Sequence, residues 1–139
     1  MIQRIQTIWL ILAALAAFLT FKFSFFSGNM VAADQTKTFT SLTAAGNLVI
    51  LIFTAATGIA ALIAVFLYKN RKLQMRISLM AMLVSLLTIL LYYNQTRHFA
   101  EGTYDLTALL ALAVPVFFIL ALRGIYKDQK LVKSLDRLR

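Results

Sequence analysis

Four long apolar stretches alternate with short polar connections along the 139-residue chain. They cover about residues 5–26, 48–68, 77–93 and 106–122. Each is close to the roughly 17–25 residues that a helix needs to cross a hydrocarbon core about 30 Å thick. Lipid cannot satisfy backbone amides, and the alternation of β-barrel strands is not seen. The pattern therefore predicts an all-α fold, an integral membrane four-helix bundle formed as one domain over residues 1–139.

The composition fits a chain that lipid solvates. Hydrophobic residues make up 61% of the sequence, against roughly 45–50% in soluble domains. Charged residues make up 14%, and they gather between the apolar stretches. The net charge of +9 therefore lies beside lipid headgroups, so we expect anionic lipid as the partner and not nucleic acid. The chain has no cysteine, which excludes disulfides and thiolate metal sites.

The first apolar stretch has a second interpretation, because Arg4 followed by apolar residues is also how a secretory signal peptide begins. The stretch is long for the core of a signal, and alanines such as Ala13 and Ala17 lie inside it rather than at its end. An uncleaved transmembrane helix is the favoured interpretation.

Lysine and arginine are distributed unevenly between the two sides of the predicted membrane. Arg4, the connection between the second and third stretches, and the tail 123–139 share one side. Only Lys22, Lys37 and Arg97 lie on the other. Short cytoplasmic segments are rich in these cations, so both termini are predicted to be cytoplasmic in a bacterial inner membrane. The basic residues expected to contact lipid headgroups or a partner are Lys69, Arg71, Lys72, Arg76, Arg123, Lys127, Lys130, Lys133, Arg137 and Arg139.

Small residues recur every fourth position in the second stretch. Thr54 and Gly58 form one pair, and a second row contains Ala56, Ala60 and Ala64. Such spacing lets helix backbones approach closely, so this helix is predicted to be the most buried, with Ala13 and Ala17 of the first helix facing it. Packing within the chain is favoured over packing against another subunit.

Two features concern the fourth stretch. Pro115 removes a backbone hydrogen bond near its middle, which predicts a kink. Beyond it, Leu131, Leu135 and Leu138 follow helical spacing among basic residues. The tail is therefore predicted to be an amphipathic cytoplasmic helix that lies on the inner leaflet or on a partner, although its charges would also serve as a topology signal alone.

Outside the apolar stretches, candidate chemistry is sparse. Residues 27–47 form the longest connection, which is a solvated loop or a short extended cap over the helices. His98 stands near Glu101 and Asp105, but Arg97 would oppose a cation there, so a polar turn is the favoured interpretation. We expect no catalytic residue, metal site or cofactor.

Several segments resemble a known family. They are the opening at residues 1–8, the loop 68–74, the Ala113–Val114–Pro115 step, and the endings 123–125 and 130–139. Together they make the chain similar to small four-span membrane proteins of Bacteroidota, the domain-of-unknown-function family 4293. The resemblance covers essentially the whole chain and implies an inner-membrane protein, and it supplies no catalytic residue.

Three functions remain open from the sequence. The leading hypothesis is a non-enzymatic accessory or scaffolding subunit of a larger membrane assembly, motivated by the small-residue rows and an expected lack of polar residues in the core. The alternative is a small homo-oligomeric transporter or channel that moves at Pro115. A lipid-modifying enzyme is third, with the turn from Arg97 to Asp105 as its only possible site.

Overall fold

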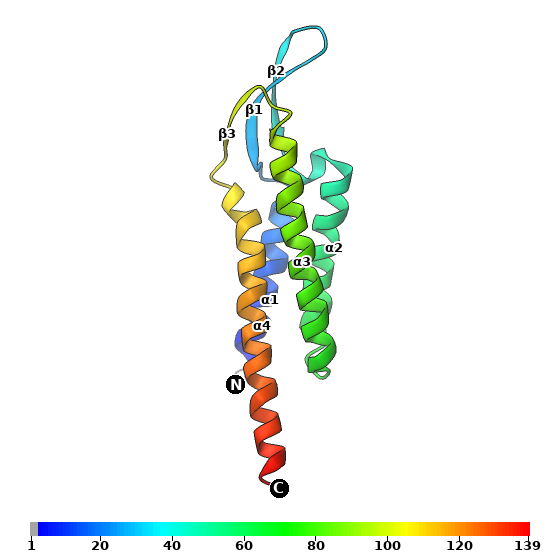
Figure 1. Ribbon diagram of the computed structural model, residues 1–139, viewed down its shortest axis with the longest axis vertical. Helices are drawn as coiled ribbons and strands as arrows, with labels where there is room; N and C mark the ends of the chain where they lie inside the picture. Colours follow the sequence, from blue (N-terminus) through cyan, green and yellow to red (C-terminus); the bar gives the residue numbers. More distant parts are fainter. Residues whose placement is uncertain (1–2) are drawn as a thin grey trace.

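The computed structural model describes residues 3–139 and is mostly helical (Figure 1). In chain order its elements are α1 (Gln3–Leu19), β1 (Phe26–Val31), β2 (Lys37–Leu42), a short 3-10 helix η1 (Ala44–Gly46), α2 (Leu48–Phe66), α3 (Arg71–Thr96), β3 (Glu101–Tyr104) and α4 (Ala108–Arg137). The sequence-based prediction of a mostly helical chain is confirmed.

Two asparagines define where the central helices begin. The side chain of Asn47 accepts hydrogen bonds from the amides of Val49 and Ile50, at 3.0 and 3.5 Å, and so caps α2. Asn70 caps α3 in the same way, accepting from Leu73 at 3.3 Å. Asparagine is among the best N-capping residues because its oxygen satisfies amides that lack a partner in the first turn. The two caps fix the tight turn between α2 and α3.

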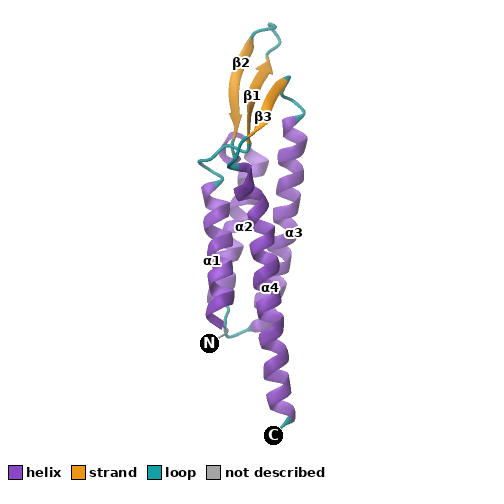
Figure 2. Cartoon of the chain, turned by 90° about the vertical axis from the view of Figure 1, so that its left-hand side faces the viewer, coloured by secondary structure: helices purple, strands orange, loops and turns teal. Residues whose placement is uncertain are grey.

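The helices run up and down in sequence order (Figure 1). α1 packs against α2 and α4, and α3 packs against the same two helices, so the four enclose a common centre. The start of α1 and the end of α4 lie at the same end of the helices as the α2–α3 turn (Figures 1 and 2). At that end α4 projects beyond the other three helices (Figure 1).

Three helices, α2, α3 and α4, are long and apolar enough to cross a membrane. The apolar part of α1, Ile5–Leu19, is shorter. The prediction of a helix over residues 5–26 is wrong at its far end, because α1 ends at Leu19 and β1 begins at Phe26. Phe25 and Phe26 are apolar for another reason, because both are buried within the protein. Phe25 stacks on Tyr92 of α3 with ring centroids 4.5 Å apart, so these aromatic side chains cover the ends of the helices.

A three-stranded antiparallel sheet stands at the end opposite the termini, in the order β2–β1–β3 (Figure 2). β1 and β2 form a hairpin, so the connection 27–47 is the extended alternative of the two that the sequence left open. β3 pairs with the other edge of β1 and brings Gly102 opposite Gly28. The strictly all-α prediction is therefore wrong at this end of the chain. The strands are short, and glycine, serine and asparagine in β1 hide the strand pattern.

The centre of the helices is built largely from alanine. The main buried cluster contains Leu10 of α1, Phe118 of α4 and alanines from all four helices, including Ala13 and Ala17. Small side chains let helices approach closely where lipid provides no hydrophobic driving force between them. The prediction that the second helix is the most buried is wrong. Among the three longest helices, 39% of the most apolar part is buried in α4, 33% in α2 and 28% in α3.

Candidate functional site

The buried face of α3 is polar along most of its length. Its buried positions are Gln74, Ser78, Ala81, Ser85, Thr88 and Tyr92. They are spaced alternately by four and three residues, which is the repeat of a helix that faces its neighbours along one seam. Leucines such as Leu79, Leu83 and Leu90 are exposed on the same helix. α3 therefore turns its polar side chains inward and its apolar ones outward, as expected of a helix surrounded by lipid.

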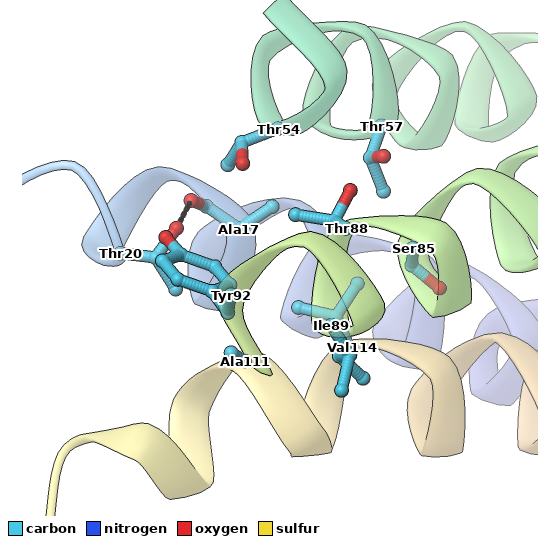
Figure 3. A pocket seen from close by; sticks show the side chains of 10 residues that line it. All are labelled: Ala17, Thr20, Thr54, Thr57, Ser85, Thr88, Ile89, Tyr92, Ala111 and Val114. Atoms are coloured by element: carbon cyan, nitrogen blue, oxygen red, sulfur yellow. Dashed lines mark hydrogen bonds between the residues drawn. The ribbon is translucent and has the colours of Figure 1, made fainter. Parts of the chain in front are cut away.

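Side chains from all four helices meet the upper half of this seam in a small chamber (Figure 3). Six side chains contribute hydroxyls to it: Thr20, which follows α1, Thr54 and Thr57 of α2, and Ser85, Thr88 and Tyr92 of α3. Four apolar side chains complete the lining: Ala17, Ile89, Ala111 and Val114. Its volume is about 20 Å³. A space of that size holds about one water molecule.

Most of the chamber's hydroxyls are bonded to their own helix. Thr57 donates to the carbonyl of Phe53 at 2.8 Å, and Thr88 donates to that of Val84 at 2.9 Å. Ser85 and Thr20 do the same with carbonyls three residues earlier. In contrast, Thr54 Oγ1 and Tyr92 Oη are buried without a well-formed hydrogen bond in the described part of the chain, although Tyr92 interacts with the hydroxyls of Thr20 and Thr54.

The seam continues toward the end where the termini lie. Gln74 Nε2 donates to the carbonyl oxygen of Ala64 at 2.9 Å and so joins α3 to the last turns of α2. Ser78 Oγ and Gln6 Nε2 are buried there without partners among the described residues. Asp128 of α4 is 6% exposed, and its Oδ2 atom likewise has none. The expectation that the core lacks polar residues is therefore wrong.

A basic groove lies at the end of the molecule that carries the termini. It is lined by Tyr68, Lys69, Asn70, Arg71 and Lys72 from the α2–α3 turn, and by Gln129, Val132 and Lys133 from α4. Arg71 Nη1 donates to the backbone oxygen of Asp128 at 3.2 Å, which holds the turn against α4. No carboxylate lines this groove. Its charge and openness suit an anionic group or an acidic segment.

The ten basic residues predicted to contact headgroups or a partner divide between the turn, α3 and α4. Arg71 is half-buried, and the other nine are exposed. Lys69, Arg71, Lys72 and Lys133 meet in the basic groove; Arg123 and Lys127 line a second groove against α1. The remaining four, Arg76, Lys130, Arg137 and Arg139, line neither groove.

The predicted packing residues lie on different faces of their helices. Five of them are buried: Ala13, Ala17, Thr54, Gly58 and Ala64. The contact at Gly58 is close, because a Cβ atom at that position would meet the ring of Phe18 at 2.8 Å. Ala60 is half-buried and Ala56 is exposed. The buried row of α2 instead continues from Thr57 to Ala61 and Ala64. Pro115 lies buried inside α4, which is helical on both sides of it; the kink stays a prediction.

The residues around His98 serve the sheet. Glu101 of β3 pairs with Lys37 of β2, with Nζ and Oε1 3.4 Å apart. Asp105 accepts a hydrogen bond from Ser27 Oγ at 2.6 Å and another from Ser24, while His98 is exposed. No group of three or more histidine, cysteine, aspartate or glutamate side chains that could hold a metal occurs within residues 3–139. The two carboxylates are thus used in local structure.

These features define a class of protein: a mostly helical chain with apolar outward faces, three helices long enough to span a membrane, and a domain whose function is unknown. The chain belongs to the family described as domain of unknown function (DUF4293), whose model matches residues 2–138. The resemblance drawn from the sequence is confirmed at this level. No curated protein and no solved structure matches the chain.

The polar seam is the main feature that the sequence interpretation missed. The row of buried polar residues from Gln74 to Tyr92 was not recognised from the sequence. The signal was present in the sequence, because polar residues recur at spacings of four and three within an otherwise apolar helix.

Proposed function

We propose that this chain crosses a bacterial inner membrane four times, with both termini in the cytoplasm. The termini and the α2–α3 turn share one end of the molecule, where most of the lysines and arginines lie (Figure 1). That arrangement fits the enrichment of cations in cytoplasmic segments. α1 supplies the fourth crossing, with its shorter apolar length completed by the turn and aromatic residues that follow Leu19. The sheet then faces the periplasm.

Within that membrane, the chain acts as a non-enzymatic accessory or scaffolding subunit of a larger assembly. The observation that carries this proposal is the basic groove. Two segments far apart in sequence, the turn at 68–72 and the helical tail around Lys133, are brought together there by the bond from Arg71 to Asp128. A surface held by specific contacts and lined by four cations suits an acidic cytoplasmic segment of a partner.

The projecting end of α4 adds to this surface. Leu131, Leu135 and Leu138 are 49%, 64% and 85% exposed, and they alternate with basic side chains. Such an amphipathic cytoplasmic helix lies against the inner leaflet or a partner. Its cations are attracted to anionic headgroups by about 1 kcal/mol each near the surface.

Mild extraction from native membranes followed by mass spectrometry tests the accessory role. A tagged chain is expected to retain a stoichiometric membrane-protein partner. The triple variant Lys69→Gln, Lys72→Gln, Lys133→Gln should lose it, because those cations line the groove. The matched control is Lys130→Gln, Arg137→Gln, Arg139→Gln, which removes the same charge outside the groove. A chain that is solitary in several detergents, or equal loss in both variants, contradicts the proposal.

The polar seam favours one second candidate, a small homo-oligomeric transporter or channel. Polar side chains buried between helices can mark a path for substrate or ions. Here the hydroxyls mostly bond to their own backbone, and the chamber has room for about one water, so a path would need α3 or α4 to move. Flux into proteoliposomes that disappears in Ser85→Leu, which fills the chamber, would support this function. Proteoliposomes that show no flux with the unchanged chain would count against this function.

A further inference from the structure

A second groove lies on the outer surface between α1 and α4, away from the basic groove. It is lined by Ile5 and Gln6 of α1 and by Leu120, Arg123, Gly124 and Lys127 of α4, and its volume is about 380 Å³. The four α4 residues are spaced three, one and three apart, which places them on one face of that helix. The groove is therefore formed by two helices that pack directly against each other.

The groove has cationic side chains at one end and apolar side chains one helical turn further along α4. Arg123 and Lys127 are exposed cations one helical turn apart, immediately after the apolar stretch that ends at residue 122. Leu120 lies one turn further into that stretch, and Ile5 faces it from α1. The neighbouring carboxylate of Asp128 is buried and does not line the groove. Nothing acidic in the lining offsets the two cations.

Gln6 provides a third polar group at the same place. Its side chain is only 5% exposed, yet its amide nitrogen Nε2 has no hydrogen-bond partner among the described residues. A buried amide donor without a partner is costly and marks a site that a ligand could complete. Gly124 makes room for it, because a Cβ atom at position 124 would come within 2.7 Å of Gln6 Cγ. The charged ends of Arg123 and Lys127 therefore lie at the rim of a groove whose lining is almost entirely apolar, and Gln6 adds a buried unpaired donor beside it.

We propose that this groove binds one anionic phospholipid of the inner leaflet. Its phosphate lies between Arg123 and Lys127 and accepts a hydrogen bond from Gln6 Nε2, while an acyl chain follows the apolar surface of Leu120 and Ile5. A phosphate suits the donors, because guanidinium and ammonium groups form charge-assisted hydrogen bonds with it. The apolar surface selects a lipid over free phosphate. This inference rests on the membrane orientation proposed above and not on the accessory role.

Native mass spectrometry of the detergent-purified chain tests the site, with dioleoyl phosphatidylglycerol as the probe. We expect one tightly held lipid at low molar ratio, and much weaker binding of dioleoyl phosphatidylcholine. The double variant Arg123→Gln, Lys127→Gln should weaken that first binding event roughly 30-fold, because two cations near the surface are lost. The control Lys130→Gln, Arg137→Gln removes the same charge outside the groove and should change affinity less than about twofold.

If the double variant does not fold, a variant that leaves the charge of the chain unchanged still tests the lipid site. Gly124→Leu places a side chain against Gln6 and fills the groove, so it should also abolish the tight binding event while circular dichroism shows intact helices. Equal affinity for both lipids, equal loss in the control, or displacement of the lipid by millimolar inorganic phosphate would overturn the proposal. If the chain keeps the lipid but copurifies with no protein partner, only the proposed accessory role is contradicted, and the lipid site is not.

Discussion

The guanidinium of Arg71 donates a hydrogen bond from Nη1 to the backbone oxygen of Asp128 across 57 positions of sequence. One residue opens α3 and the other lies in the last third of α4. The bond therefore ties the α2–α3 turn to the start of the projecting tail, and Arg71 itself lines the basic groove. A carbonyl acceptor leaves the charge of Arg71 uncompensated, so the groove remains cationic.

Replacing Arg71 by alanine should loosen this end of the molecule. A hydrogen bond from a charged donor that is half-buried is worth about 1 kcal/mol, and we expect a loss of that size in the free energy of unfolding. The measurement is unfolding in detergent micelles followed by circular dichroism. Arg76→Ala is the control, because Arg76 is exposed on the same helix and lines neither groove. If the two variants are equally stable, Arg71 does not hold the turn.

Gly28→Ala should separate β3 from β1. The two strands approach so closely that a Cβ atom at position 28 would collide with the backbone oxygen of Glu101 and come within 2.6 Å of Gly102 Cα. Backbone cannot move aside cheaply, so the expected result is faster hydrogen exchange over residues 101–104. Gly46→Ala is the control, since its Cβ would meet only Thr43 Oγ1 at 3.6 Å, an ordinary contact. Unchanged exchange in Gly28→Ala would show that the strands tolerate a wider spacing.

The helices could be predicted because their physical signal is long and local. The apolar run that follows Asn47 identifies α2 from the sequence alone, whereas α3 begins at Arg71, six residues before the predicted stretch 77–93. The far end of α1 could not be placed, because Phe25 is as apolar as a lipid-facing residue although it packs on Tyr92. Hydropathy measures only the solvent a side chain prefers, and here a neighbouring ring takes the place of lipid.

The two grooves could be predicted only in part. The basic residues were visible, but whether Lys69 lies near Lys133, or Arg123 near Gln6, depends on how α4 rotates about its axis. That rotation is fixed by long-range packing, such as the fit of Phe118 among alanines of the other helices. Pairings between distant segments carry no local sequence signal, so the sites appear only in the folded chain.

The direction of insertion gives a prediction that does not depend on any partner. Because the basic end of the molecule is expected to stay in the cytoplasm, a fluorescent protein fused after Arg139 should fluoresce, and alkaline phosphatase fused there should be inactive. A phosphatase inserted in the β1–β2 turn, after Asp34, should be active. An active fusion at Arg139 would reverse the orientation and remove the inner leaflet as the source of the proposed phospholipid.

The polar seam should stabilise the helices only where its side chains have partners. Gln74 Nε2 bonds the carbonyl of Ala64 inside the structure, so Gln74→Leu should lower the free energy of unfolding by about 1 kcal/mol, the scale of hydrogen bonds between membrane helices. Thr54 Oγ1 meets the Tyr92 side chain without a well-formed hydrogen bond, so the isosteric Thr54→Val should change stability by less than about half that amount. Both can be measured by unfolding in mixed micelles. A large loss in Thr54→Val would mean that its hydroxyl bonds Tyr92 or an ordered water in the chamber.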